Sequence, residues 1–179
     1  MGINEHLERM LLRAETLMAR IESVLPQALH APDWKASIAF RYRKRSNGHG
    51  VLEPVKHVAS LSLDDLKEID VQKEKIQRNT LQFVQGLPAN NVLLTGARGT
   101  GKSSLIKACL QTYAPQGLRL IEVDKQDMVD LPDIIEVVAS RPEKFIIFCD
   151  DLSFEEGEPG YKALKSILDG TVAAATPNV

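Results

Sequence analysis

One stretch of the chain constrains its fold more than any other: NVLLTGARGTGKSS, residues 91–104. Residues 91–94 open an apolar run that predicts a short buried strand. Residues 96–103 fit the P-loop pattern of Gly, four residues and Gly-Lys-Ser, and residues 104–113 continue as a predicted helix. The pattern requires a strand before it and a helix after it, and both are predicted. The structural alternative is a glycine-rich turn with an exposed lysine.

Each position of this loop has a physical reason to contact a phosphate. The glycines let the backbone turn so that successive N–H groups point inward, and the following helix directs its positive end at the same anion. Lys102 is placed to reach the β- and γ-phosphates of a nucleotide, and Ser103 to ligate Mg²⁺. The predicted nucleotide-binding residues here are Gly96, Ala97, Arg98, Gly99, Thr100, Gly101, Lys102, Ser103 and Ser104.

The segments after the loop alternate between strand and helix patterns. Residues 118–123 and 145–149 are apolar runs; the second is typical of a parallel strand covered on both faces, and residues 131–139 predict a helix between them. Strand, helix, strand, helix, strand predicts a right-handed parallel sheet with ligands at the carboxyl ends of its strands. The predicted fold class is therefore α/β, with flanking helices.

Two adjacent acids follow the last apolar run. Hydrophobic residues ended by Asp form the Walker B arrangement, in which Asp150 would hold Mg²⁺, directly or through water, together with Ser103. Asp151 stands where a hydrolase needs a carboxylate to orient and deprotonate the attacking water. Lys102 and Asp151 are thus the predicted catalytic residues, and a cap on the following loop is the alternative role for Asp151.

Residues 1–60 form a separate predicted region ahead of a nucleotide-binding core at 61–179. Apolar residues spaced three and four apart over residues 3–25 predict a helix. We expect it to pack on the rest of the protein; the alternative is a coiled-coil arm for a partner. Alternation over residues 34–43 predicts a strand, and residues 51–58 could return as the second strand of a hairpin, confined to a sheet edge by Pro54.

The predicted hairpin is basic and aromatic. Arg41, Arg43, Lys44 and Arg45 lie beside Tyr42 and near Trp34. Such a mixture can bind single-stranded nucleic acid, but we favour a solvated edge strand protected by its charges. Further along, Ser62 with Asp65 predicts a short turn, and Asp70 is expected to cap a longer helix that stops at Gly86.

Composition sets broad limits. The net charge of −2 excludes a polycation that coats nucleic acid, and no apolar run approaches the length that spans a bilayer. The first residues lack the shape of a signal peptide. Cys109 and Cys149 make neither a disulfide framework nor a metal site. We therefore expect a cytoplasmic protein without a membrane partner.

From about Phe40 to its end, the chain resembles the AAA+ ATPases, and among them a bacterial family of P-loop ATPases whose biological role is unassigned. The segments that carry the resemblance are FRYRKRSNGHGVLEPV (40–55), IDVQKEKIQRNT (69–80), LPANNVLLTGARGTGKSSL (87–105), LRLIEVDK (118–125) and FCDDLSFEEGEPGYKALKSILDG (148–170). The resemblance implies ATP and Mg²⁺ as ligands, a homo-oligomer, and an adenine pocket near Ile69 and Asp70.

The chain also departs from that pattern. An AAA+ core continues with a sensor-1 strand between the P-loop and Walker B strands, an arginine finger and a helical lid, whereas this chain ends at Val179. We expect a C-terminally truncated core, or else a compact sheet in which a strand from the region of Trp34 fills in. Asp151 replaces the usual Glu. Because an arginine finger contributes about 10³ to 10⁵ in rate, turnover should be slow.

Two functions remain open at this stage. The first is an Mg-ATP-binding AAA+ ATPase whose hydrolysis moves an unknown protein partner. The second is a nucleotide-gated binding module that recruits a partner through its N-terminal helix or basic hairpin, with little hydrolysis. A P-loop kinase is a weaker third, because the tandem acids and the lack of an acceptor-site signature count against it.

Overall fold

The computed structural model describes residues 3–24, 29–45, 48–153, 159–168 and 176–179. In this part of the chain a mixed α/β fold has one sheet with the strand order β2-β1-β3-β4. The strands are β1 (Ala39–Lys44), β2 (Gly50–Pro54), β3 (Leu118–Glu122) and β4 (Lys144–Phe148). The helices are α1 (Ile3–Val24), α2 (Asp70–Val84), α3 (Lys102–Tyr113), α4 (Leu131–Ala139) and α5 (Pro159–Leu168), with 3-10 turns η1 (Leu63–Asp65), η2 (Ala114–Gln116) and η3 (Lys125–Asp130).

The N-terminal hairpin is part of this sheet. β1 pairs antiparallel with β2, and its other edge pairs parallel with β3, so that Phe40 lies opposite Ile121. The predicted hairpin is therefore confirmed, and it extends the sheet on the side of β3. Pro54 ends β2 on the outer edge, where its missing N–H leaves no ladder bond unmade. A Cβ on Gly50 would overlap the ring of Tyr42, so the hairpin requires glycine there.

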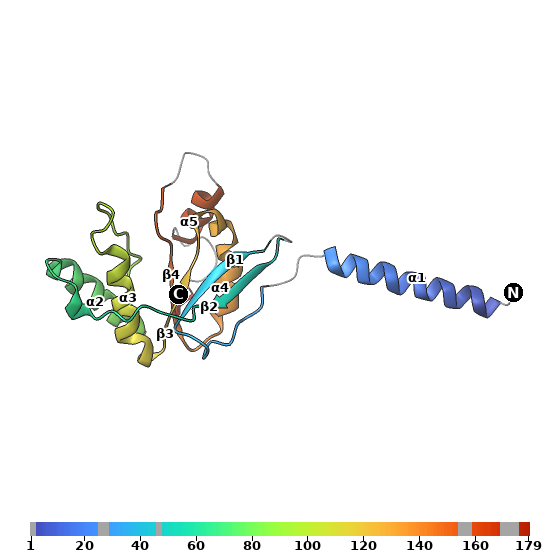
Figure 1. The fold of residues 1–179 in the computed structure, drawn as a ribbon, viewed down its shortest axis with the longest axis horizontal. Coiled ribbons are helices and arrows are strands. Elements are labelled where there is room, and N and C mark those ends of the chain that lie inside the picture. Colours follow the sequence, from blue (N-terminus) through green and yellow to red (C-terminus); the bar gives the residue numbers. More distant parts are fainter. Residues whose placement is uncertain (1–2, 25–28, 46–47, 154–158, 169–175) are drawn as a thin grey trace.

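The chain crosses from β3 to β4 through α4. The two strands are parallel, with Leu120 opposite Ile146, as the alternation of strand and helix patterns predicts. Figure 1 shows α2 and α3 on one side of the sheet and α4 and α5 on the other. With helices on both faces, β4 contributes Phe145 and Ile147 to one core and Ile146 and Phe148 to the other, which explains its continuous apolar run.

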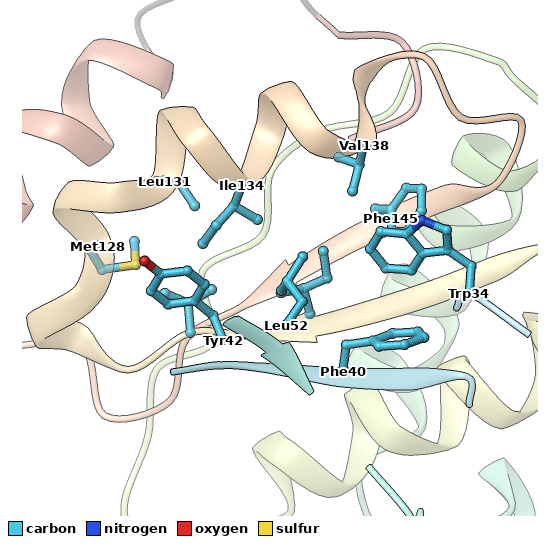
Figure 2. Packing of buried hydrophobic residues seen from close by; sticks show 11 residues of the cluster. Trp34, Phe40, Tyr42, Leu52, Met128, Leu131, Ile134, Val138 and Phe145 are labelled. Atoms are coloured by element: carbon cyan, nitrogen blue, oxygen red, sulfur yellow. The ribbon is translucent and has the colours of Figure 1, made fainter. Parts of the chain in front are cut away.

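The core beneath α4 is built around three aromatic rings. Trp34 meets Phe40 and Phe145 edge-to-face, with ring centroids 4.7 Å and 4.8 Å apart. Figure 2 shows these rings between the sheet and α4, whose apolar side chains point toward them. Edge-to-face pairs add about 0.5–1.5 kcal/mol to the gain from burial, so this cluster fixes the sheet against α4.

The core on the opposite face is formed chiefly by α3. Its buried residues include Leu105, Cys109 and Leu110, which share a cluster with Ile76 of α2 and Leu118 of β3. The two clusters lie on the two faces of the same strands. The position of α3 is therefore fixed by the core on one face of the sheet, and Phe145 of β4 is held in the core on the other face.

The prediction of a strand at residues 91–94 is wrong. The structure gives these residues no strand pairing, and Val92 and Leu93 are 46% and 76% exposed. A strand forms only where a neighbour completes its ladder, and this segment adjoins none of the described strands. Residues 177–179, whose sequence Pro-Asn-Val is compatible with the start of a strand, instead include a turn. The Asn178 carbonyl nevertheless accepts a hydrogen bond from the Phe145 N–H at 2.7 Å.

α1 differs from the favoured expectation. Figure 1 shows it lying apart from the sheet and the other helices, and its large apolar side chains between Leu7 and Ile21 are 52–63% exposed. A helix packed on the rest of the protein would bury them. No helix in the described part of the chain is both long and apolar enough to cross a bilayer. The sequence also predicts a solvated acidic patch at Glu155, Glu156 and Glu158, and these residues lie outside the described part of the chain.

Truncating Phe145, which is 1% exposed, to Ala should lower the free energy of unfolding by about 3–5 kcal/mol, because the removed ring leaves a cavity beside Trp34. Denaturant unfolding followed by Trp34 fluorescence measures the loss. Val129→Ala, at a residue 40% exposed on η3, is the control and should change stability by less than about 0.5 kcal/mol. Equal effects of the two substitutions would contradict this account of the core.

Candidate functional site

The glycine-rich loop, residues 96–101, leads into α3 through two left-handed glycines. Gly99 has a φ of +82° and Gly101 a φ of +84°, a conformation that costs other residues about 1–2 kcal/mol. Gly101 is the N-cap of α3 and provides no side-chain hydrogen bond to the helix. The first N–H groups of this 12-residue helix are therefore not occupied by the N-cap side chain, and such a helix end attracts anions.

Lys102 is the first residue of α3 and folds back over the loop. Its Nζ donates hydrogen bonds to the carbonyl oxygens of Gly96 at 2.9 Å and Ala97 at 2.7 Å. The hydroxyl of Thr100 donates to the same Ala97 carbonyl at 2.9 Å. These bonds hold the ammonium group beside the loop, where a bound phosphate would compete with the two carbonyls for it.

The start of α3 meets the end of β4 through one short hydrogen bond. The Ser103 hydroxyl donates to Asp150 Oδ2 at 2.7 Å, across 47 residues of sequence. The other carboxylate oxygen, Oδ1, accepts a bond from the N–H of Asp151 at 3.1 Å. A hydroxyl that donates to a carboxylate at this distance makes a charge-assisted bond. The structure therefore brings together the two residues predicted to share a metal ion.

The geometry of Ser103 and Asp150 fits a magnesium ion. Adjacent oxygen ligands of an octahedral Mg²⁺ lie about 2.9 Å apart, because each bond is about 2.0–2.1 Å long. The 2.7 Å between these two oxygens is close to that separation. Among the described residues, no group of three or more His, Cys, Asp and Glu side chains could hold a metal ion. Water and phosphate oxygens would supply the remaining ligands, as magnesium prefers.

Asp151 lies next to this pair in an unusual backbone conformation. Its φ is +51°, which is uncommon for a residue other than glycine. The residue is exposed, and its own N–H is used by Asp150. The structure thus places the predicted base just after the carboxyl end of β4, next to Asp150 and open to solvent.

Ile69 and Asp70, the two residues implied for an adenine pocket, lie in different surroundings. Ile69 lies against the loop, since a Cβ built on Gly101 would be 4.0 Å from its Cδ1. Asp70 is the first residue of α2; its side chain is 80% exposed and pairs with Lys73 at 2.9 Å. The expectation that Asp70 caps α2 is wrong, because Ile69 has the non-helical backbone of the N-cap position.

A pair of asparagines fixes the approach to the loop. The Asn79 side chain on α2 donates to the Asn90 carbonyl at 2.8 Å and accepts from the Asn90 N–H at 2.9 Å. Both bonds join α2 to the segment that enters the loop. Sequence reasoning missed this contact, because two asparagines eleven residues apart match no pattern.

A second contact that the sequence does not reveal lies at the carboxyl end of β3. Arg41 pairs with Glu122 at 2.8 Å because the parallel register places these residues opposite each other. The hydrogen bond to Glu122 and its charge raise the pKa of Arg41, and Asp124 adds to this. The sequence alone could not predict this ion pair, because doing so requires knowing that β1 pairs with β3.

The basic hairpin is largely neutralised by acids of the same chain. The described ion pairs are Arg41–Glu122, Lys44–Asp130 and Arg45–Glu53, at 2.8 Å, 2.9 Å and 3.7 Å. Trp34 and Tyr42 are 4% and 3% exposed and belong to the core. Bases stack on accessible rings, so this geometry counts against the interpretation of the hairpin as a single-stranded nucleic-acid surface.

Cys149 directly follows β4 and precedes Asp150, and it lacks the features of a reactive thiol. Burial raises its pKa to about 11, and the charges of Asp124 and Asp150 act in the same direction. The thiol is therefore protonated at neutral pH. Nucleophilic chemistry by this cysteine is not supported, because the thiolate is the reactive form.

The fold and the candidate site define an α/β protein with a glycine-rich loop before α3 and a serine–aspartate pair at the end of β4. Over residues 35–179 the sequence matches the family described as "Protein of unknown function (DUF815)". The match covers most of the chain, and the protein belongs to this family. No curated protein and no solved structure matches the chain.

The pKa of Cys149 gives a test of the charges around the site. Asp124→Asn should lower this pKa by removing a negative charge, and a drop of half a unit would raise the thiolate fraction at pH 8 about threefold. Iodoacetamide labelling, followed by mass spectrometry, measures the rate at Cys149, while Cys109 is fully buried. Asp133→Asn on α4 is the charge-matched control; the idea fails if both variants label at the same rate.

Proposed function

We propose that this protein is a P-loop ATPase of the AAA+ type, which binds Mg-ATP at residues 96–103 and hydrolyses it to ADP and phosphate to act on a protein partner. The observation that carries the proposal is the 2.7 Å contact between Ser103 and Asp150. It joins the first turn of α3 to the end of β4, so a metal ion held there would lie beside the anion loop. The DUF815 match neither assigns nor opposes this activity.

The residues around the loop would have separate roles in binding phosphate, binding Mg²⁺ and orienting water. The glycine-rich loop and the first turn of α3 would bind the phosphates through backbone N–H groups, while Lys102 would exchange its two carbonyl partners for phosphate oxygens. When bound, Mg²⁺ would offset the charge of the β- and γ-phosphates. Ser103 and Asp150 would hold that ion, which leaves Asp151 to orient water.

Ile69 is the residue best placed to contact the base, because it packs against Gly101 at the end of the loop. Asp70 would contribute to the base site through its backbone or through its ion pair with Lys73, because its side chain is not buried. Residues 91–94 count against a complete P-loop fold, since they form no strand. A homo-oligomer and a cytoplasmic location remain parts of the proposal that rest on the resemblance and on composition.

A binding module with little hydrolysis is the second candidate. The observation that favours it is the state of Asp151, which is exposed and has a left-handed backbone. A general base must be held within hydrogen-bonding reach of the water that it deprotonates. An exposed aspartate, one methylene shorter than glutamate, meets that requirement poorly. Binding and turnover therefore need separate tests.

Lys102→Ala should weaken ATP binding about 10- to 100-fold, because charge-assisted hydrogen bonds to phosphate are worth about 1.5–3 kcal/mol. Calorimetric titration with Mg-ATP measures the affinity. Lys107→Ala, on the exposed face of the same helix, is the matched control and should bind like the unmodified chain. Equal affinities for all three proteins would remove the phosphate site from consideration.

Asp151→Asn should leave ATP affinity nearly unchanged and lower the turnover rate about 10²- to 10⁴-fold if this carboxylate is the general base. Phosphate release under single-turnover conditions measures the chemical step. Asp150→Asn provides the contrast, because it should weaken the dependence of binding on Mg²⁺. Full turnover by Asp151→Asn would exclude Asp151 as the base, and measurable binding with no turnover by the unmodified chain would favour the binding module.

A further inference from the structure

The segment that enters the glycine-rich loop has few ties to the rest of the described chain. Residues 91–94 pair with no strand, and Leu93 is 76% exposed. Among the described residues, the only hydrogen bonds that join residues 88–95 to another element are the two between Asn79 of α2 and Asn90. Backbone with so few contacts opens at a low cost in free energy, so the position of this segment depends on Asn79.

The other end of the loop is held by a packed helix. The loop continues into α3, where Leu105 and Ile106 are 2% and 9% exposed and belong to the core on that face of the sheet. The entry to the loop has one partly buried apolar side chain, Leu94, against the same core. A loss of contacts at the entry should therefore change the conformation of the loop without unfolding the core.

The side chain of Asn79 suits this contact because its amide carries both a donor and an acceptor. Its Nδ2 donates to the Asn90 carbonyl at 2.8 Å, and its Oδ1 accepts from the Asn90 N–H at 2.9 Å. One side chain thus occupies both backbone groups of one residue, as an antiparallel strand would. An aspartate could accept but not donate, and an alanine could do neither, so the pair of bonds requires the amide.

Lys102 provides a second tie at the start of the loop, but phosphate would compete for it. Its Nζ donates to the carbonyl oxygens of Gly96 and Ala97, which joins the start of the loop to α3. In the proposed function, Lys102 exchanges these carbonyls for phosphate oxygens and releases the start of the loop. The bonds between Asn79 and Asn90 use no group that would bind phosphate, so they would persist and hold the entry in place.

We propose that Asn79 is a positioning residue, which holds the glycine-rich loop in the conformation that binds the phosphates of a nucleoside triphosphate. The inference rests on the proposed function for the identity of the ligand. Asn79 acts through the backbone of Asn90 and contacts neither the phosphates nor the base. Without its two bonds, a smaller fraction of the chains would have an ordered loop, and the apparent affinity for phosphate would fall by that fraction.

Calorimetric titration of the full chain with Mg-ATP and with Mg-tripolyphosphate tests this role. Asn79→Ala should raise both dissociation constants by the same factor, about 3- to 30-fold, because two modest hydrogen bonds are lost from the loop. Gln82→Ala removes an exposed amide from the same helix and should leave both constants unchanged. Unchanged constants in Asn79→Ala would overturn the proposal, and a loss confined to Mg-ATP would overturn it by assigning Asn79 to the base or sugar.

Single-turnover kinetics separate positioning from catalysis. Bound phosphate restores the ordered loop, so Asn79→Ala at saturating Mg-ATP should release phosphate within about twofold of the rate of the unmodified chain. The Mg-ATP concentration that gives half of this rate should rise by the factor seen in the titration. A rate at saturation that falls as much as the affinity would overturn the positioning role, because Asn79 would then act on the chemical step.

Hydrogen exchange of the chain without nucleotide tests the contact independently of ATP. Asn79→Ala should speed exchange at residues 90–101 and leave β3 and β4 unchanged, with the same midpoint of denaturant unfolding, because alanine is a better helix former than asparagine. Unchanged exchange at these residues, or faster exchange throughout the chain, would overturn the positioning role. An unmodified chain that binds neither ligand would instead refute the proposed ATPase, so the two failures are distinguishable.

Discussion

The hydrogen bond between Ser103 and Asp150 depends on nearly every layer of the structure. Asp150 is held at its place because β4 pairs with β3 and buries Phe145 beside Trp34. Ser103 is held because α3 packs its buried face on the other side of the sheet. A shift of either layer by an ångström would separate the two oxygens beyond hydrogen-bonding distance. The distance between Ser103 and Asp150 therefore depends on the packing of both hydrophobic cores.

The parts of the fold that sequence reasoning predicted are those with a local physical signal. The hairpin follows from alternating side chains and an edge proline. The helix at residues 131–139 was predicted with Pro132 in its first turn, where proline is tolerated. The glycine-rich turn into α3 was equally visible, because its glycines and lysine stand at fixed spacings, whereas anion binding by this loop stays a prediction. In each case the pattern and the structural requirement span fewer than twenty residues.

The parts that sequence reasoning missed depend on partners far away in the chain. Residues 91–94 have the composition of a strand, but composition cannot supply a neighbour, and the segment remains unpaired. The Arg41–Glu122 pair exists only because β1 joins β3. For α1, periodicity predicted the helix but could not decide whether its apolar face meets this chain or another. Each miss concerns a non-local choice that the residues themselves leave open.

The glycine-rich loop adjoins α2 at two points, one before the loop and one at its last residue. The Asn79 side chain of α2 is hydrogen-bonded to the backbone of Asn90 before the loop, and Ile69, the N-cap of α2, lies near Gly101, where an added Cβ would be 4.0 Å from Ile69 Cδ1. The two contacts lie about ten residues apart along α2, which is roughly 15 Å of helix. A tilt of α2 would therefore move both ends of the loop segment between them. Any protein that tilts α2 would distort the loop amides directly, and any ligand that tightens the loop would pull on α2. The position of α2 and the conformation of the glycine-rich loop are therefore linked through these two contacts.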